Sequence, residues 1–190
     1  MQVKDVVLRN RSYRRFDEHV PISTDTLREL VDLARLSPSG ANRQPLKYIL
    51  SNEPVRNARI FPALRWAGYL KDWPGPSEGE RPSAYIIILE DTEISSHVRC
   101  EQGIAAQSIL LGATEKGLGG CIFGSIQRRM LRDVLHIAER YEILLVIALG
   151  LPVETVVIDP LPADGNTKYW RDEQSVHHVP KRSLDEIIIA

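Results

Sequence analysis

This 190-residue sequence has two cysteines, a formal net charge of −1 and no long apolar run. Cys100 and Cys121 are far apart and lie outside any CxxC pattern, which argues against a disulfide scaffold and favours a reducing compartment. The 24 basic residues nearly balance the 25 acidic ones, so the chain has no global field that would gather nucleic acid or anionic membrane. Any anion site must therefore be local.

The sequence also lacks the patterns of membrane insertion and export. The longest apolar stretch, residues 143–153, is much shorter than the ~20 residues of a membrane-spanning helix, and it is better interpreted as a buried strand. The N-terminal residues alternate charges with short apolar pieces and have no signal-peptide core. We therefore expect a cytoplasmic protein, and the length predicts a single domain over residues 1–190.

Apolar periodicity predicts both helices and strands. Helical spacing favours helices at residues 3–9, from Ser23 to Pro38, and at about 94–116, where many small residues permit close approach of another backbone. Short β-branched runs predict strands at residues 46–51, 84–90 and 143–149. Because the last two are apolar on both faces, we expect helices to cover the sheet on both sides.

Four arginines and a serine crowd the start of the chain: Arg9, Arg11, Ser12, Arg14 and Arg15. Guanidinium groups bind phosphate in a bidentate manner, so this cluster is a candidate anion site, although a solvated basic turn explains it equally well when it is judged alone. Lys181 and Arg182 follow Pro180 near the other end. These two residues would serve the same anion if the C-terminal segment folded back.

The glycine-rich segment GLGGCIFG, residues 117–124, does not match known nucleotide motifs. Ile122 breaks the GxGxxG pattern, and a phosphate-binding loop would need Lys and Ser or Thr where Leu118 and Gly119 stand. What is left is a helix end that leads into a strand, and the final Gly124 would let a flat ligand approach the backbone. A tight turn without a ligand is an equally open explanation.

Two further patterns bear on the chemistry. The turn SPSGANRQPLKY, residues 37–48, carries two amide side chains, Asn42 and Gln44, that a plain connector would not need. The adjacent His177 and His178 invite a metal interpretation, but neighbouring histidines point in different directions and no ligand spacing accompanies them, so no metal is predicted. Since no nucleophile motif such as GxSxG is present either, we assign no catalytic side chain, and the chemistry would need a cofactor.

Four motifs, taken in this order, make the chain similar to the nitroreductase family of FMN-dependent oxidoreductases. They are Arg-Ser-x-Arg-x-Phe at residues 11–16, SPSxxNxQP at 37–45, GLGGCIFG at 117–124, and HxPKR with LDEII at 178–188. The resemblance runs through nearly the whole chain. It implies an α+β fold with a central mixed sheet covered by helices on both faces, and an intertwined homodimer that binds two FMN molecules at the subunit interface.

The resemblance also implies which residues contact the cofactor. On one subunit, the phosphate and nearby polar atoms would be held by Arg11, Ser12, Arg14, Lys181 and Arg182. The partner chain would contribute Pro38, Ser39, Asn42 and Gln44. The backbone at Ile122, Phe123 and Gly124 would face the reactive N5 side of the flavin.

The activity implied by the resemblance is a ping-pong reaction in which NADH or NADPH reduces FMN and leaves, and an electron-poor acceptor such as a nitroaromatic or a quinone takes its place. The segment 71–83, with three prolines and two glycines in 13 residues, predicts a long loop that is a candidate substrate cover. Trp73 in this loop, with Trp66 and Tyr69 before it, would join the cover; core or dimer packing explains these aromatics equally well. The alternatives for the whole chain are an FMN-binding or sensory module without turnover, and a dimeric interaction domain.

Overall fold

The computed structural model describes residues 2–95 and 100–189, which form helices, strands and two short 3₁₀ turns. The helices are α1 (Val3–Arg9), α2 (Thr24–Arg35), α3 (Pro54–Ile60), α4 (Glu101–Glu115), α5 (Arg128–Leu135) and α6 (Leu184–Ile187). The strands are β1 (Phe16–Asp17), β2 (Leu46–Ser51), β3 (Ala84–Asp91), β4 (Gly119–Phe123), β5 (Tyr141–Pro152), β6 (Val156–Pro160), β7 (Trp170–Arg171) and β8 (His177–Lys181). The 3₁₀ turns are Gly40–Asn42 and Phe61–Ala63.

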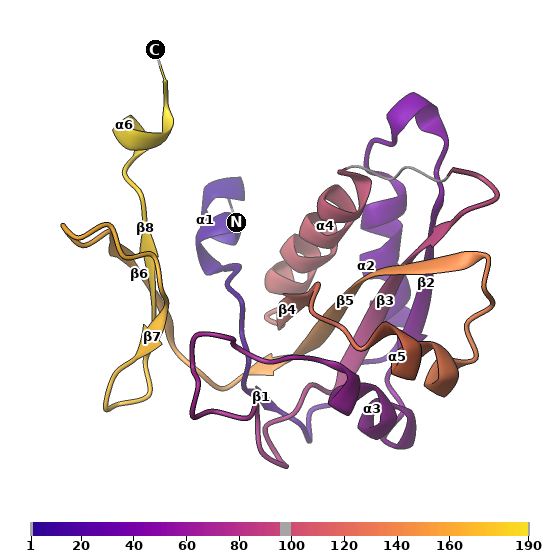
Figure 1. The fold of residues 1–190 in the computed structure, drawn as a ribbon, viewed down its shortest axis with the longest axis horizontal. Helices are drawn as coiled ribbons and strands as arrows, with labels where there is room; N and C mark the ends of the chain where they lie inside the picture. The colour runs from indigo at the N-terminus through magenta and orange to yellow at the C-terminus, as the bar shows by residue number, and fades with distance from the viewer. Residues whose placement is uncertain (1, 96–99, 190) are drawn as a thin grey trace.

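A five-stranded sheet forms the centre of the molecule, and β5 is its organising strand (Figure 1). One edge of β5 pairs with β3, which pairs in turn with β2, and the other edge pairs with β4 and β1. All these ladders are antiparallel, so the mixed character that was expected is reduced to a single parallel bridge between Ser12 and Gly120. The sequence indicates that the strands are buried on both faces of the sheet. Such burial does not determine whether neighbouring strands run parallel or antiparallel.

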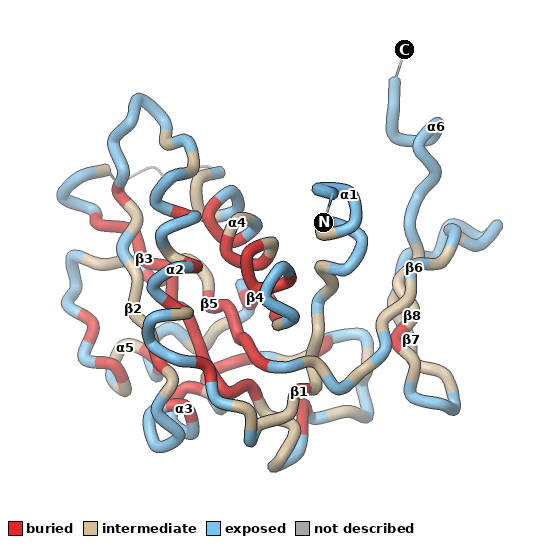
Figure 2. The backbone as a smooth tube through the Cα atoms, turned by 180° about the vertical axis from the view of Figure 1, so that it is seen from behind, coloured by how far each residue is buried: buried red, intermediate tan, exposed pale blue. Residues whose placement is uncertain are grey.

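Two apolar clusters cover the two faces of this sheet, as the sequence predicts. Because side chains alternate along a strand, β3 contributes Ile86 and Ile88 to one cluster and Tyr85 and Ile87 to the other. Helices α2 and α4 pack on the first face, and α3 and α5 pack on the second. The buried residues therefore gather in the sheet and on the inner sides of the helices, as Figure 2 shows in red.

The close approach predicted for the long helix occurs between α4 and α2. A Cβ added at Gly112 would lie 2.3 Å from Leu33 Cδ1 and 3.0 Å from Leu30 Cδ2, so a larger residue would require these leucine side chains to shift. The predicted start of this helix near Ile94 is wrong, because Ile94 closes a turn on Asp91 and α4 begins at Glu101. Residues 96–99 of the predicted helix lie outside the described residues.

The chain beyond the central sheet forms a C-terminal arm, residues 153–189, in which β6 and β7 pair with β8. In Figures 1 and 2 this arm stands to one side of the central body, and α1 lies between them. Neither α1 nor α6 contains a buried residue. Within residues 2–95 and 100–189, the structure contains no helix with both the length and the apolarity to span a bilayer.

Candidate functional site

The two ends of the chain meet in one cavity of about 350 Å³, which we call the arginine cavity. The N-terminal segment after α1, helix α4, strand β4 and the C-terminal arm all contribute to its walls. The predicted site residues that line it are Arg11, Ser12, Arg14, Ile122 and Lys181. The structure thus brings together five residues that the sequence spreads over most of the chain.

Among the described residues, the cations of the arginine cavity form no ion pair with an acidic side chain. Arg11 donates from Nη2 to the carbonyl oxygen of Val7 at 2.7 Å, and its buried Nε has no hydrogen-bond partner in the part of the chain that the structure describes. Arg14 donates from Nη1 to the carbonyl oxygen of Ser12 at 3.2 Å. Across the described part of the chain, no carboxylate forms an ion pair with Arg11, Arg14 or Lys181. The cavity therefore carries positive charge that an anion can neutralise.

His177 is a residue of this cavity that the sequence analysis did not assign to it. Its Nε2 lies 3.1 Å from Arg14 Nη1, and burial, reinforced by the Arg14 charge, lowers the pKa of His177 to about 4. The ring is therefore neutral at pH 7, accepts from Arg14 at Nε2, and carries its proton on Nδ1, which is buried without a partner among the described residues. Strand alternation could have revealed this position, because His177, Val179 and Lys181 share one face of β8.

The neighbouring His178 points to the other face of β8 and makes different contacts. Its Nδ1 lies 2.8 Å from Asp159 Oδ2, its Nε2 lies 3.2 Å from Asp172 Oδ2, and its ring stacks on Trp170 at 4.1 Å. Its hydrogen bonds to Asp172 and Asp159 raise the pKa of His178. This histidine therefore ties β6 and the segment after β7 to β8.

Lys181 and Arg182 differ in which cavities they reach in this structure. Lys181 lines both the arginine cavity and a separate cavity beside α6, whereas Arg182 lines only the latter and forms an ion pair with Glu186. The cation expected from Arg182 is thus absent from the arginine cavity of the described chain. Successive residues at the end of a strand face opposite sides, which is the physical reason for the split.

The Glu154 carboxylate binds the backbone of the segment that carries Arg14 and Arg15. The sequence analysis did not single out this residue. Its side chain is 0% exposed, and its Oε1 accepts hydrogen bonds from the backbone N–H groups of Arg14 and Arg15. Its Oε2 accepts from Arg171 Nη2 at 2.9 Å. One buried carboxylate therefore joins the N-terminal segment to the C-terminal arm, across about 140 residues of sequence.

The end of β4 supplies one wall of the cavity. Ile122 is exposed and lines the cavity, whereas the side chain of Phe123 turns to the opposite face and packs against Trp66 with ring centroids 4.7 Å apart. A Cβ added at Gly124 would meet only Leu145, at 3.9 Å. The chain itself leaves open space at Gly124, as the approach of a flat ligand requires.

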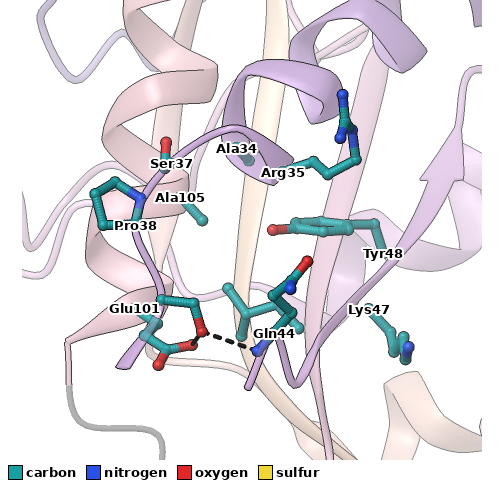
Figure 3. Close-up of a pocket in the computed structure, with 11 residues that line it drawn as sticks. Ala34, Arg35, Ser37, Pro38, Gln44, Lys47, Tyr48, Glu101 and Ala105 are labelled. Atoms are coloured by element: carbon teal, nitrogen blue, oxygen red, sulfur yellow. Dashed lines mark hydrogen bonds between the residues drawn. The ribbon is translucent and has the colours of Figure 1, made fainter. Parts of the chain in front are cut away.

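The amide-rich turn, which we call the amide loop (residues 37–44), lines a different cavity of about 210 Å³ (Figure 3). Pro38, Ser39 and Gln44 belong to this second cavity, and no residue lines both cavities. Gln44 donates from Nε2 to Asn42 Oδ1 at 3.1 Å, so the two amides contact each other. Within one chain, the structure therefore does not bring the amide loop into the arginine cavity.

Residues 71–83 form no helix or strand, as predicted, and this loop packs on its own chain. Arg171 lies 4.3 Å from the centroid of the Trp73 ring, and Trp66 makes an edge contact with Trp73 at 6.3 Å. Tyr69 contacts the ring of Tyr169, a residue of the arginine cavity, at 5.0 Å. These contacts show the packing role of the aromatic residues and place Tyr69, just before the loop, next to the cavity.

Comparison with known proteins agrees with these observations. The model of the Nitroreductase family matches residues 7–151. The chain is 25% identical over 164 residues to an oxygen-insensitive NADPH nitroreductase of Helicobacter acinonychis, covering 70% of this chain and 78% of that enzyme. It is 23% identical over 201 residues to 4-nitrobenzoate reductase of Pseudomonas putida, covering 83% and 88%. An FMN-dependent nitroreductase of Clostridium difficile shares the fold, with a TM-score of 0.66, 20% identity, and coverage of 78% and 87%.

Proposed function

The chain belongs to the nitroreductase family, and from this premise we propose that it is an FMN-dependent oxidoreductase. It takes hydride from NADH or NADPH and passes the electrons to an electron-poor acceptor, such as a nitroaromatic or a quinone, in two alternating half-reactions. The names of its relatives support three parts of this proposal: one uses NADPH, one reduces 4-nitrobenzoate, and one structural relative is FMN-dependent.

The arginine cavity is the observation that carries this proposal. Arg11 and Arg14 reach it from the start of the chain and Lys181 from near the end, and in the described residues none of them has a carboxylate partner. Three unpaired cations around one cavity fit a phosphate monoester, because phosphate oxygens accept charge-assisted hydrogen bonds from several donors at once. The phosphate of FMN is such a group.

The remaining walls also fit a flavin mononucleotide. Leu110, Ile122 and Val179 give the cavity apolar surface beside its cations, as a planar ring system attached to a phosphate requires. The buried Nδ1 of His177 and Nε of Arg11 are donors without partners among the described residues, and leaving such groups unsatisfied costs about 1–3 kcal/mol each. Polar atoms of a bound cofactor would satisfy them.

A homodimer follows from the same reasoning. The amide loop lies outside the arginine cavity of its own chain, so its predicted contact with FMN requires a second copy. Exposed apolar side chains on both terminal helices offer the surface for this copy: Val3, Val7, Leu8, Leu184 and Ile187. We assign residues 1–190 to one domain and place the protein in the cytoplasm, where its two free cysteines would stay reduced.

In this assignment the side chains bind and orient, and they leave the redox step to the cofactor. When bound, FMN supplies the hydride acceptance and donation that protein side chains lack. The three cations would hold its phosphate, and the open space at Gly124 would leave room for a reactant beside the cofactor. His177, with a pKa of about 4, stays neutral at pH 7 and contributes hydrogen bonds without transferring a proton.

The decisive experiment begins with the absorbance spectrum of the purified protein. We expect a yellow protein, or one that becomes yellow with added FMN, whose visible band is lost anaerobically on addition of NADH or NADPH and returns when a nitroaromatic or a quinone is added. A colourless protein that ignores FMN would refute the proposal. A stable yellow protein that neither nicotinamide bleaches would instead establish an FMN-binding module without turnover.

The oligomeric state is a separate test of the site. Sedimentation should give a dimer, and replacing Ile187, which is exposed on α6, by Glu should shift the protein towards a monomer that binds FMN less tightly. A wild-type monomer with full FMN affinity would show that the amide loop of a partner takes no part in binding.

A further inference from the structure

A carboxylate at the start of α4 accepts two hydrogen bonds from the amide loop. Glu101 is the first residue of α4, and its Oε1 accepts the backbone N–H of Gly40 at 2.7 Å. Its Oε2 accepts the hydroxyl of Ser39 at 3.1 Å (Figure 3). A Cβ at Gly40 would lie 3.1 Å from Glu101 Oε1, so the glycine lets the carboxylate approach the backbone closely.

The amide loop needs such an anchor because its backbone is strained. Ala41, Asn42 and Gln44 have φ values of 50°, 54° and 53°, in the left-handed region that residues with a Cβ disfavour. Strained backbone persists only where surrounding contacts determine it. Here the contacts form a relay, since the Ser39 hydroxyl that donates to Glu101 also accepts the backbone N–H of Gln44 at 2.9 Å.

We propose that Glu101 is a positioning residue for cofactor binding: by holding Gly40 and Ser39 it keeps the amide loop in the conformation that presents Asn42 and Gln44 to the flavin of the partner subunit. This inference rests on the function proposed above. Glu101 does not touch the cofactor and acts through the loop.

A simpler role for Glu101 is general support of α4, because a negative charge in the first turn stabilises a helix. Two substitutions separate the roles. Glu101→Asp keeps the charge at the helix start but shortens the side chain by one methylene, so it loses the reach to Gly40. Glu101→Gln keeps the reach and one acceptor oxygen, and the two lone pairs of the Ser39 hydroxyl can accept from its amide.

The first measurement is trypsin cleavage after Arg43, which is exposed within the amide loop, followed by mass spectrometry of the protein without flavin. Glu101→Ala and Glu101→Asp should be cut about tenfold faster than wild type, the factor expected for losing roughly one hydrogen bond to a charged group. Glu101→Gln should be cut at nearly the wild-type rate. Glu115→Ala, at the exposed end of the same helix, is the matched control and should not change cleavage.

The second measurement is FMN affinity, followed by quenching of flavin fluorescence. Glu101→Ala and Glu101→Asp should bind FMN about tenfold more weakly, and Glu101→Gln should restore binding. Thermal melting of each variant confirms that the fold is intact. A purely structural role in α4 would instead leave Glu101→Asp equal to wild type.

The results that would overturn this inference differ from those that would refute the function proposed above. Wild-type rates of cleavage and wild-type FMN affinity in Glu101→Asp would overturn the inference, and so would faster cleavage with unchanged affinity. A wild-type protein that binds no FMN would refute the proposed function itself, and with it the presentation of Asn42 and Gln44, while the cleavage rates would still decide whether Glu101 holds the loop.

Discussion

Replacing Glu154 by Gln tests how the two ends of the chain are joined. The Glu154 side chain is 0% exposed and accepts hydrogen bonds from two backbone N–H groups and from Arg171, whose side chain is 15% exposed. The substitution would keep the size of the side chain but would remove the buried, hydrogen-bonded counter-charge of Arg171.

The expected cost is large for a single substitution. Breaking a buried ion pair by removing one partner destabilises a protein by about 3–5 kcal/mol, out of a total of roughly 5–15 kcal/mol. For a chain of this length, that corresponds to a lowering of Tm by roughly 6–20 °C. Since Glu154 also places the backbone of Arg14, FMN affinity should fall together with stability.

Urea unfolding followed by circular dichroism measures this cost, with Glu29→Gln as the control. Glu29 pairs with Lys116 at the surface, at 2.6 Å, and an exposed pair of this kind contributes about 0–1 kcal/mol. The double variant Glu154→Gln, Arg171→Met should recover part of the lost free energy of unfolding, because it removes both charges of the ion pair. A loss below about 1 kcal/mol in Glu154→Gln would refute the reasoning.

Three further predictions concern the cavity, the arm and the amide loop. Arg11→Ala should weaken FMN binding about 10–100-fold in a fluorescence titration, whereas Arg35→Ala, outside the arginine cavity, should weaken it less. The raised pKa of His178 contributes stability that is complete below the unfolded pKa of about 6.5 and is lost as the pH rises through the folded pKa, so the Tm difference between wild type and His178→Gln should shrink from acid to alkaline pH. Ala41→Gly should be neutral or stabilising by up to about 1 kcal/mol in urea unfolding, because φ is 50° there, whereas Ala106→Gly inside α4 should cost about 1 kcal/mol.

Each of these predictions has a clear contrary result. Equal FMN affinity in Arg11→Ala and Arg35→Ala would remove Arg11 from the phosphate site. A Tm difference for His178→Gln that does not vary with pH would show that the carboxylates beside His178 do not hold its proton. Destabilisation of Ala41→Gly as large as that of Ala106→Gly would mean that the left-handed conformation at Ala41 carries no strain.

Local sequence predicted much of the secondary structure. The bounds of α1 and β2 agree with the predicted residues 3–9 and 46–51, and α2, β3 and β5 were located by the same periodicity. The start of α4 was misplaced because the apolar spacing continues through Ile94 into a turn. Helices α3 and α5 and the strands of the arm were not predicted, because each is short and is stabilised by what it packs against.

The residues of the candidate site were likewise predicted from the sequence only in part. Motif resemblance pointed to Arg11, Arg14 and Lys181, and the structure gathers them in one cavity. It also placed Arg182 in the same role, but the structure turns that residue towards Glu186. No motif indicated Glu154.

By itself, the sequence determined the residue types, the main helices and strands, and the family. Periodicity and turn chemistry act between residues a few positions apart, so they can be read directly along the chain. Only the tertiary structure decided that Glu154 meets the N-terminal arginines and that Glu101 meets Gly40, across separations of 140 and 61 residues. Such contacts depend on the path of the whole folded backbone, which no local pattern specifies.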